Sequence, residues 1–212
     1  MSDKQLTVIK PFGPTIAKAT IPSDIIEKLN NYVDNVISNE EKSKKLDHGS
    51  QLVGNVKQEI YLEDEIIESS GWSKFLADAS GAWIKTSTKK QITTFDLIKS
   101  WVVRQFKNEY NPIHWHSGHI SGAGYLKLPE TFGETYQKNK PSNSNGTLQL
   151  IHGSRAFLSN SKLVITPKVG DFYFFPHYLM HTVSPFIGSD EERRSISFNA
   201  CVDKEIFDVF SV

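Results

Sequence analysis

The spacing of apolar residues changes near Thr93, and this change limits the folds that the chain can adopt. Before it, apolar residues recur at helical intervals. After it, short runs rich in β-branched and aromatic residues alternate with turn-forming residues, which predicts strands. Several short strands that follow helices favour a β-sandwich or jelly roll with helices packed on one sheet. The predicted strands cover residues 97–106, 111–126, 146–151, 169–176, 181–185 and 193–202.

The length and composition favour a single domain, because 212 residues with 38% hydrophobic content can bury a sizeable core. We expect one domain over 1–212, in which a helical region over 1–92 supports a β core over 93–212. A polar stretch at 130–145 predicts a long loop. Such loops, together with the N-terminal helices, are where we expect the walls of a substrate pocket.

The N-terminal region contains two predicted helical blocks. Apolar residues at helical spacing predict a helix over 24–38, with Ser23 as its candidate N-cap. A second block covers about 64–86, with a break at Gly71. A short strand is expected over Leu6–Ile9. The plain interpretation of all these segments is a scaffold for the β core.

The charge balance and the cysteine count exclude several classes of protein. Basic and acidic residues both number 24, so the net charge is zero and a nucleic-acid partner is not expected. The single cysteine, Cys201, forms no intrachain disulfide, and we expect it to be a buried thiol rather than a nucleophile. No signal peptide and no membrane helix are predicted, which favours a cytoplasmic protein. The sequence leaves open whether the chain forms homo-oligomers.

Three of the seven histidines, His114, His116 and His119, fall within six residues. In an extended strand, His114 and His116 point to the same face and can bind one metal ion together. His119 has the opposite parity, so we expect it to line the substrate entrance or to be structural, unless Gly118 disturbs the strand and exchanges their roles. Histidines are often ordinary, partly buried residues of strands, so this pair alone is weak support for a metal site.

A more distant histidine, His181, can complete a metal site. A facial triad needs two ligands close in sequence and a third from a distant strand. His181 follows a strongly β-prone run that ends at Phe175 and a tight turn at Pro176–Tyr178. This placement makes His181 the candidate third ligand.

The last predicted strand has two different faces. A guanidinium binds a carboxylate in a bidentate manner and a hydroxyl adds a donor, so an arginine-and-serine face suits a dicarboxylate. A solvent-facing strand would explain the same pattern equally well. Arg193 is preferred as the anchor over Arg194, whose neighbours on its own face are apolar. One face carries Arg193, Ser195, Ser197 and Asn199, and the other carries Arg194, Ile196 and Phe198.

Together these motifs resemble the 2-oxoglutarate/Fe(II)-dependent oxygenases, and in particular their small phage and bacterial subgroup. The resemblance covers residues 101–202. The order of a histidine motif, a distal histidine and an Arg-x-Ser a dozen residues later carries it. The matching pieces are His114-Trp115-His116, Ser121-Gly122-Ala123-Gly124-Tyr125-Leu126, Gly170-Asp171 through Phe175-Pro176 with His181, and Arg193-Arg194-Ser195 through Asn199.

The resemblance implies a double-stranded β-helix, the cupin-like jelly roll, with Fe(II) inside its open end. It implies that His114 and His181 are iron ligands, and that Arg193 with Ser195 binds the distal carboxylate of 2-oxoglutarate. Tyr125 and Trp101 are candidates for the floor of that pocket. The implied activity couples O2-dependent decarboxylation of 2-oxoglutarate to succinate with oxidation, as a rule hydroxylation, of a small molecule or peptide. No catalytic residue is expected beyond the metal centre.

His116 departs from the family pattern, which places a carboxylate at this position. His116 can be the second ligand, which gives a three-histidine site one charge more positive than the usual triad. Alternatively, water or halide takes the position, as in the halogenating relatives that lack the carboxylate. We favour ligation, because histidine can bind a metal whereas alanine or glycine cannot.

Two other functions fit parts of the same pattern. A cupin-type dioxygenase with three histidine ligands needs no co-substrate and therefore no anchoring arginine. In a non-catalytic jelly-roll binding module, the histidines would be packing residues and the protein would hold no stoichiometric metal. The sequence does not identify the substrate.

Other polar residues have plainer interpretations. The charged segment 39–50 is expected to be a solvated loop, with His48 exposed in it. Asp171 is expected to be a turn residue rather than a ligand. No supporting pattern surrounds His152 or His177.

Overall fold

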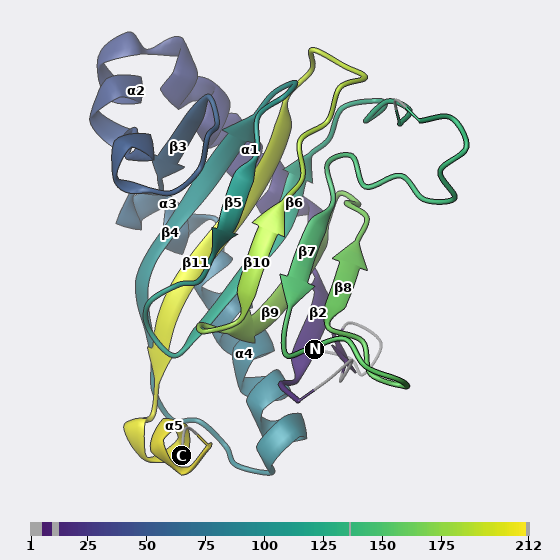
Figure 1. The fold of residues 1–212 in the computed structure, drawn as a ribbon. Coiled ribbons are helices and arrows are strands. Elements are labelled where there is room, and N and C mark those ends of the chain that lie inside the picture. Colours follow the sequence, from purple (N-terminus) through teal and green to yellow (C-terminus); the bar gives the residue numbers. More distant parts are fainter. Residues whose placement is uncertain (1–5, 10–12, 136, 211–212) are drawn as a thin grey trace.

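The computed structural model describes residues 6–9, 13–135 and 137–210. Two antiparallel β-sheets lie face to face, and helices cover the outer face of the larger sheet (Figure 1). All strand pairings in this part of the chain are antiparallel. The expected jelly roll, a double-stranded β-helix with helices on one sheet, is confirmed.

The larger sheet has seven strands and the smaller sheet has four. In spatial order the larger sheet contains β1 (Leu6–Ile9), β2 (Ile16–Thr20), β9 (Asp171–Pro176), β6 (Ile120–Lys127), β11 (Arg193–Val202), β4 (Phe95–Gln105) and β3 (Gln58–Tyr61). The smaller sheet contains β5 (Asn111–His114), β10 (Met180–Val183), β7 (Leu148–Ile151) and β8 (Lys162–Ile165).

Most of the helices come from the N-terminal region and lie behind the larger sheet (Figure 1). They are α1 (Ser23–Ser38), α2 (Glu40–Leu46), α3 (Asp64–Ser69) and α4 (Trp72–Thr88), with a 3-10 turn η1 (Gly49–Gln51) and a C-terminal α5 (Lys204–Phe210). The break between α3 and α4 falls at Gly71, which has a φ of 85° and marks the predicted interruption. In the described part of the chain, no helix combines the length and the apolar character that crossing a membrane requires.

Strand β9 shows how one run of aromatic residues serves two core layers. Alternate side chains of a strand point to opposite faces of its sheet. Phe172 and Phe174 therefore pack into the core beneath the helices, whereas Tyr173 and Phe175 pack into the core between the two sheets. The continuous run of aromatic residues is explained by burial on both sides.

Several predictions for the N-terminal region are wrong in detail. Part of the charged segment 39–50 forms α2, because the Asn39 side chain accepts a hydrogen bond from the Lys42 amide and caps the helix. Ser23 already belongs to α1, with Pro22 at the cap position and no side-chain cap. His48 is not simply exposed, because its ring stacks on Tyr61 at 3.9 Å.

The β-strands and the burial of Cys201 also differ from the prediction. The segment 111–126 is two strands, β5 and β6, because the chain turns between them at Gly118, whose φ is 88°. Strands β2, β3 and β8 are not predicted, since they are short and two of them lie in the region expected to be helical. Cys201 is partly exposed rather than buried.

Glycines 122 and 124 on β6 let the aromatic residues of β9 approach the strand. A Cβ atom added at Gly124 would lie 2.3 Å from Phe172 Cδ2 and 2.8 Å from the Asp171 carbonyl oxygen. Phe172 cannot move aside easily, because its ring also packs against Trp72 and Phe198. Gly124 is therefore required by close packing between two central strands.

We expect Gly124→Ala to lower the free energy of unfolding by about 1–3 kcal/mol, because overpacking displaces a fully buried ring. Denaturant titration followed by tryptophan fluorescence measures this. Gly81→Ala in α4 is the matched control, since its Cβ would lie 3.7 Å from Ile92 and alanine favours helices. Equal stability of the two variants would contradict this account of β6.

Candidate metal and co-substrate site

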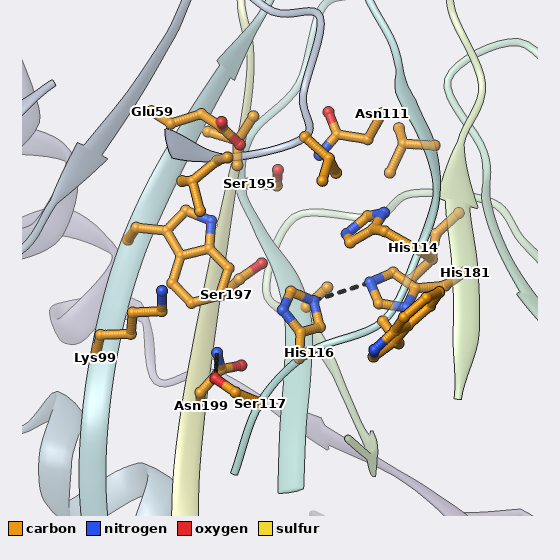
Figure 2. A pocket seen from close by; sticks show the side chains of 18 of the residues that line it. Glu59, Lys99, Asn111, His114, His116, Ser117, His181, Ser195, Ser197 and Asn199 are labelled. Carbon is orange, nitrogen blue, oxygen red and sulfur yellow. Dashed lines mark hydrogen bonds between the residues drawn. The ribbon is translucent and has the colours of Figure 1, made fainter. Parts of the chain in front are cut away.

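A cavity of about 240 Å³ lies between the two sheets. Its walls come from β3, β4, β6 and β11 of the larger sheet and from β5, β7 and β10 of the smaller one, and the segment after η1 also reaches it. Figure 2 shows that polar side chains from both sheets point into this space. The residues predicted from the histidine motifs and from the Arg193 face line the same cavity.

Three histidines meet on one side of the cavity (Figure 2). His114 is the last residue of β5 and pairs directly with His181 on β10. His116 lies just beyond β5, so the chain turn rather than strand periodicity brings it to the other two. One ring nitrogen from each residue lies within 4.8 Å of the others. The Nε2 atoms of His116 and His181 are 3.0 Å apart.

Backbone carbonyls orient two of these rings. Nδ1 of His114 lies 2.7 Å from the Pro112 carbonyl oxygen, and Nδ1 of His181 lies 2.9 Å from that of Leu179. A carbonyl oxygen can only accept, so each Nδ1 carries the proton. Both Nε2 atoms therefore carry lone pairs rather than protons, which is the arrangement usual for histidines that bind a metal. The lone pair of His181 accepts a hydrogen bond from Nε2 of His116.

Burial keeps these imidazoles neutral. Desolvation, together with the neighbouring histidines, lowers the pKa of His116 to about 2 and that of His181 to about 3. Desolvation also lowers the pKa of His114. A neutral imidazole offers a lone pair to a cation, whereas a protonated one repels it. The donor set therefore fits a divalent metal ion.

The remaining histidines of this region have structural contacts. His119 lies away from the three, with Nδ1 3.1 Å from the Val202 carbonyl oxygen and its ring stacked on Phe207 at 3.8 Å. His177 has a function that its sequence context does not reveal. Its carbonyl oxygen accepts a 2.9 Å hydrogen bond from the His116 amide, which holds the turn carrying His116.

Arg193 lies across the cavity on β11 and is 2% exposed. Its Nη1 donates to Gln105 Oε1 at 2.8 Å and approaches Ser195 Oγ at 3.3 Å. Its guanidinium carbon lies 5.1 Å from the centre of the Tyr125 ring, and its Nε has no hydrogen-bond partner. Among the described residues no carboxylate pairs with it, and desolvation lowers the pKa of its guanidinium.

Arg194 points the other way, as the alternation of β11 requires. Its side chain forms ion pairs with Glu192 at 2.9 Å and with Asp34 of α1 at 2.7 Å. Arg194 thus joins the sheet to the helices, and the arginine that faces the cavity is Arg193. Ser195, Ser197 and Asn199 line the cavity with it, as the face pattern predicts.

Several polar residues of the cavity are not identified by the sequence motifs. Glu59 on β3, Lys99 on β4 and Asn111 on β5 line the cavity, but none of them belongs to a predicted ligand or co-substrate motif. Gln105 on β4, which accepts a hydrogen bond from Arg193, is not predicted either. The pairing β3–β4, between segments about forty residues apart in the chain, brings Glu59 to the cavity. Asp171 is not a turn residue: it begins β9, is buried, and forms a 2.7 Å ion pair with Lys18.

Comparisons with known proteins agree with this geometry. Residues 99–199 match the sequence family described as "Putative 2OG-Fe(II) oxygenase". The prolyl-4-hydroxylase of Pseudomonas putida has a TM-score of 0.54 at 14% identity, covering 87% of this chain and 91% of its own. A comparison with curated protein sequences found no significant match.

Two further solved structures share the fold. The viral collagen prolyl hydroxylase of Paramecium Bursaria Chlorella virus-1, in a 2-oxoglutarate complex, has a TM-score of 0.51 at 17% identity over 93% of this chain and 96% of its own. A Trichoplax adhaerens prolyl hydroxylase bound to a hypoxia inducible factor peptide has a TM-score of 0.51 at 14% identity. The match covers 99% of this chain and 89% of the hydroxylase. Identities this low establish the fold alone.

The fold and the site define a double-stranded β-helix protein with three converging histidines between its sheets. The part of the chain that carries the histidines and Arg193, residues 99–199, matches the family of 2OG-Fe(II) oxygenases. This match supports the resemblance inferred from the motifs.

Glu59 makes a testable contribution to the pH dependence of stability. Desolvation and the nearby Asp47 carboxylate raise its pKa from 4.5 to about 7. Between these values the folded state holds a proton that the unfolded state has released, so stability falls as the pH rises through this window. A shift of this size corresponds to about 3 kcal/mol.

We expect Glu59→Gln to remove this component, so that the free energy of unfolding depends less on pH between about pH 5 and pH 8. Urea titrations at several pH values measure the slope for both proteins. An unchanged slope would show that the Glu59 carboxyl keeps its ordinary pKa.

Proposed function

We propose that this protein is an Fe(II)- and 2-oxoglutarate-dependent dioxygenase that hydroxylates a small molecule or a peptide side chain. One observation carries the proposal: a fully buried guanidinium without a carboxylate partner in the described part of the chain faces the same cavity as three converging neutral imidazoles. A buried cation without a counter-charge is costly, which favours an anionic ligand beside Arg193.

The three histidines would hold the metal through their Nε2 atoms. The hydrogen bonds from His114 to Pro112 and from His181 to Leu179 set the ring orientations before any metal binds. His116 takes the position where the family expects a carboxylate. Its Nε2 lies 3.0 Å from that of His181, which favours ligation by His116 over water or halide.

The Arg193 pocket would hold the distal carboxylate of 2-oxoglutarate. Arg193 offers a charged donor and Ser195 offers a hydroxyl beside it. The Tyr125 hydroxyl is buried and makes no hydrogen bond in the described structure. Burial raises the pKa of Tyr125 to about 12, so the hydroxyl keeps its proton and can donate a hydrogen bond to a carboxylate.

When bound, Fe(II) and 2-oxoglutarate would supply the oxidation, in which O2 gives one oxygen atom to succinate and the other to the substrate, with release of CO2. The residues of this chain would bind, orient and shield. Trp101, whose ring centre lies 5.4 Å from that of His116, would shield one side of the metal from water. The aliphatic side chains of Leu148 and Val183 add apolar wall.

The alternatives from the motif analysis account for less of this geometry. A cupin-type dioxygenase without co-substrate uses the three histidines but leaves the buried, unpaired Arg193 without a function. In a non-catalytic jelly roll, neither the three converging histidines nor the buried Arg193 would have a function. Both predict measurements different from those of a 2-oxoglutarate enzyme.

We expect the protein to bind about one Fe(II) per chain, and His181→Ala to weaken that binding about 100-fold or more. Elemental analysis after anaerobic loading and gel filtration measures it. His116→Ala should also lose metal if His116 is a ligand, whereas His119→Ala, outside the three, should retain it. Wild-type protein that holds no metal would refute the metal centre and favour the binding module.

We expect Arg193→Ala to weaken 2-oxoglutarate binding about 100-fold, because it removes two charge-assisted donors from a buried carboxylate. The visible charge-transfer band that forms when 2-oxoglutarate chelates Fe(II) under anaerobic conditions reports binding. Succinate formation should fall in parallel. Absence of the band in the wild type, with no conversion to succinate, would refute the proposal. A band or turnover unaffected by Arg193→Ala would favour the cupin-type alternative.

A further inference from the structure

The cavity contains a second buried ionisable group that the proposed reaction does not use. Glu59 on β3 is 1% exposed, and its Oε2 atom has no hydrogen-bond partner in the described structure. The other two buried carboxylates of the described residues are paired, Glu192 with Arg104 and Arg194, and Asp171 with Lys18. Glu59 is therefore the one buried carboxylate of the described residues that forms no ion pair.

Glu59 points into the cavity rather than into the protein interior. Figure 2 shows its carboxyl group at the edge of the pocket, on the side where Asn111 and Ser195 also lie. A Cβ atom added at Gly54 would lie 3.0 Å from Glu59 Oε1 and 3.1 Å from Asn111 Oδ1. The segment after η1 thus closes over two oxygen atoms that come from different sheets.

These oxygens form an acceptor-rich corner in a cavity with aromatic walls. Trp101 and Trp115 line the same space, and indole faces attract cations. Two cationic groups also line the cavity. Lys99 lies 3.2 Å from the Tyr61 hydroxyl and over the Trp101 ring, and Arg193 lies on β11 beside Ser195. Neither forms an ion pair with Glu59, so its charge is available to a ligand.

We propose that Glu59, with Asn111 Oδ1, binds a protonated amine of the substrate and thereby orients it above the metal position. The inference rests on the proposed oxygenase function, which it extends by naming an amine-bearing substrate class. A bound ammonium group would supply the counter-charge that the buried carboxylate lacks, and it would donate to both oxygens. Burial and Asp47 raise the pKa of Glu59 to about 7, and an adjacent cation would favour its ionised form.

The test uses n-butylammonium as the probe with metal-free protein at about pH 8, where the amine is charged. Ligand-observed NMR should detect binding to the wild type, and Glu59→Gln should weaken it about tenfold or more. Gly54→Ala should also weaken it, because its methyl group would crowd both oxygens. Glu68→Gln, an exposed residue of α3, is the matched control and should bind as the wild type does.

Three results would overturn the inference: no binding of the amine to the wild type, equal binding to Glu59→Gln, or equal binding of butyrate or n-butanol. The proposed function is tested by a separate measurement, the charge-transfer band of Fe(II) and 2-oxoglutarate. Glu59→Gln should form that band with wild-type affinity, because Arg193 and the histidines are intact. A missing band in the wild type would refute the oxygenase function while the amine result stands unaffected.

Discussion

The alternation of side chains along β11 is the constraint on which the rest of the structure depends. The strand lies between β6 and β4 at the centre of the larger sheet and is buried on both faces. Arg194, Ile196 and Phe198 point towards the helices, so Arg193 and the residues in phase with it must point into the cavity. A shift of one residue would place the apolar side chains in the cavity and the polar ones in the core.

The cavity contains two buried ionisable groups of opposite type that form no ion pair in the described chain. Arg193 has no carboxylate partner in the described chain, and Glu59 has no partner for its Oε2 atom. Burying Arg193 and Glu59 without an ion-pair partner costs stability. Both residues line the cavity that contains the three histidines, where a functional site can require them. The stability of the sheets and helices compensates for this cost, with Arg194, Glu192 and Arg104 forming a paired network on the opposite face.

Much of the site follows from local sequence. The motif around His114 and His116, the distal His181 and the face of Arg193 and Ser195 identify residues that the fold brings to one cavity. Strand periodicity does not place His116, because this residue follows the end of β5. It reaches the other histidines through the turn that contains Gly118 and through the hydrogen bond to His177.

The sequence by itself determined the class of fold and identified the three histidines and the arginine face as candidates, because short motifs and strand alternation mark these residues. Only the tertiary structure decided that Glu59, Lys99 and Asn111 share this cavity, and that β2 and β3 complete the larger sheet. Such placements depend on pairing between distant segments, as when β3 joins β4 or when Gly54 closes over Asn111. No local pattern records those contacts, since the energy of long-range packing, rather than backbone preference, selects them.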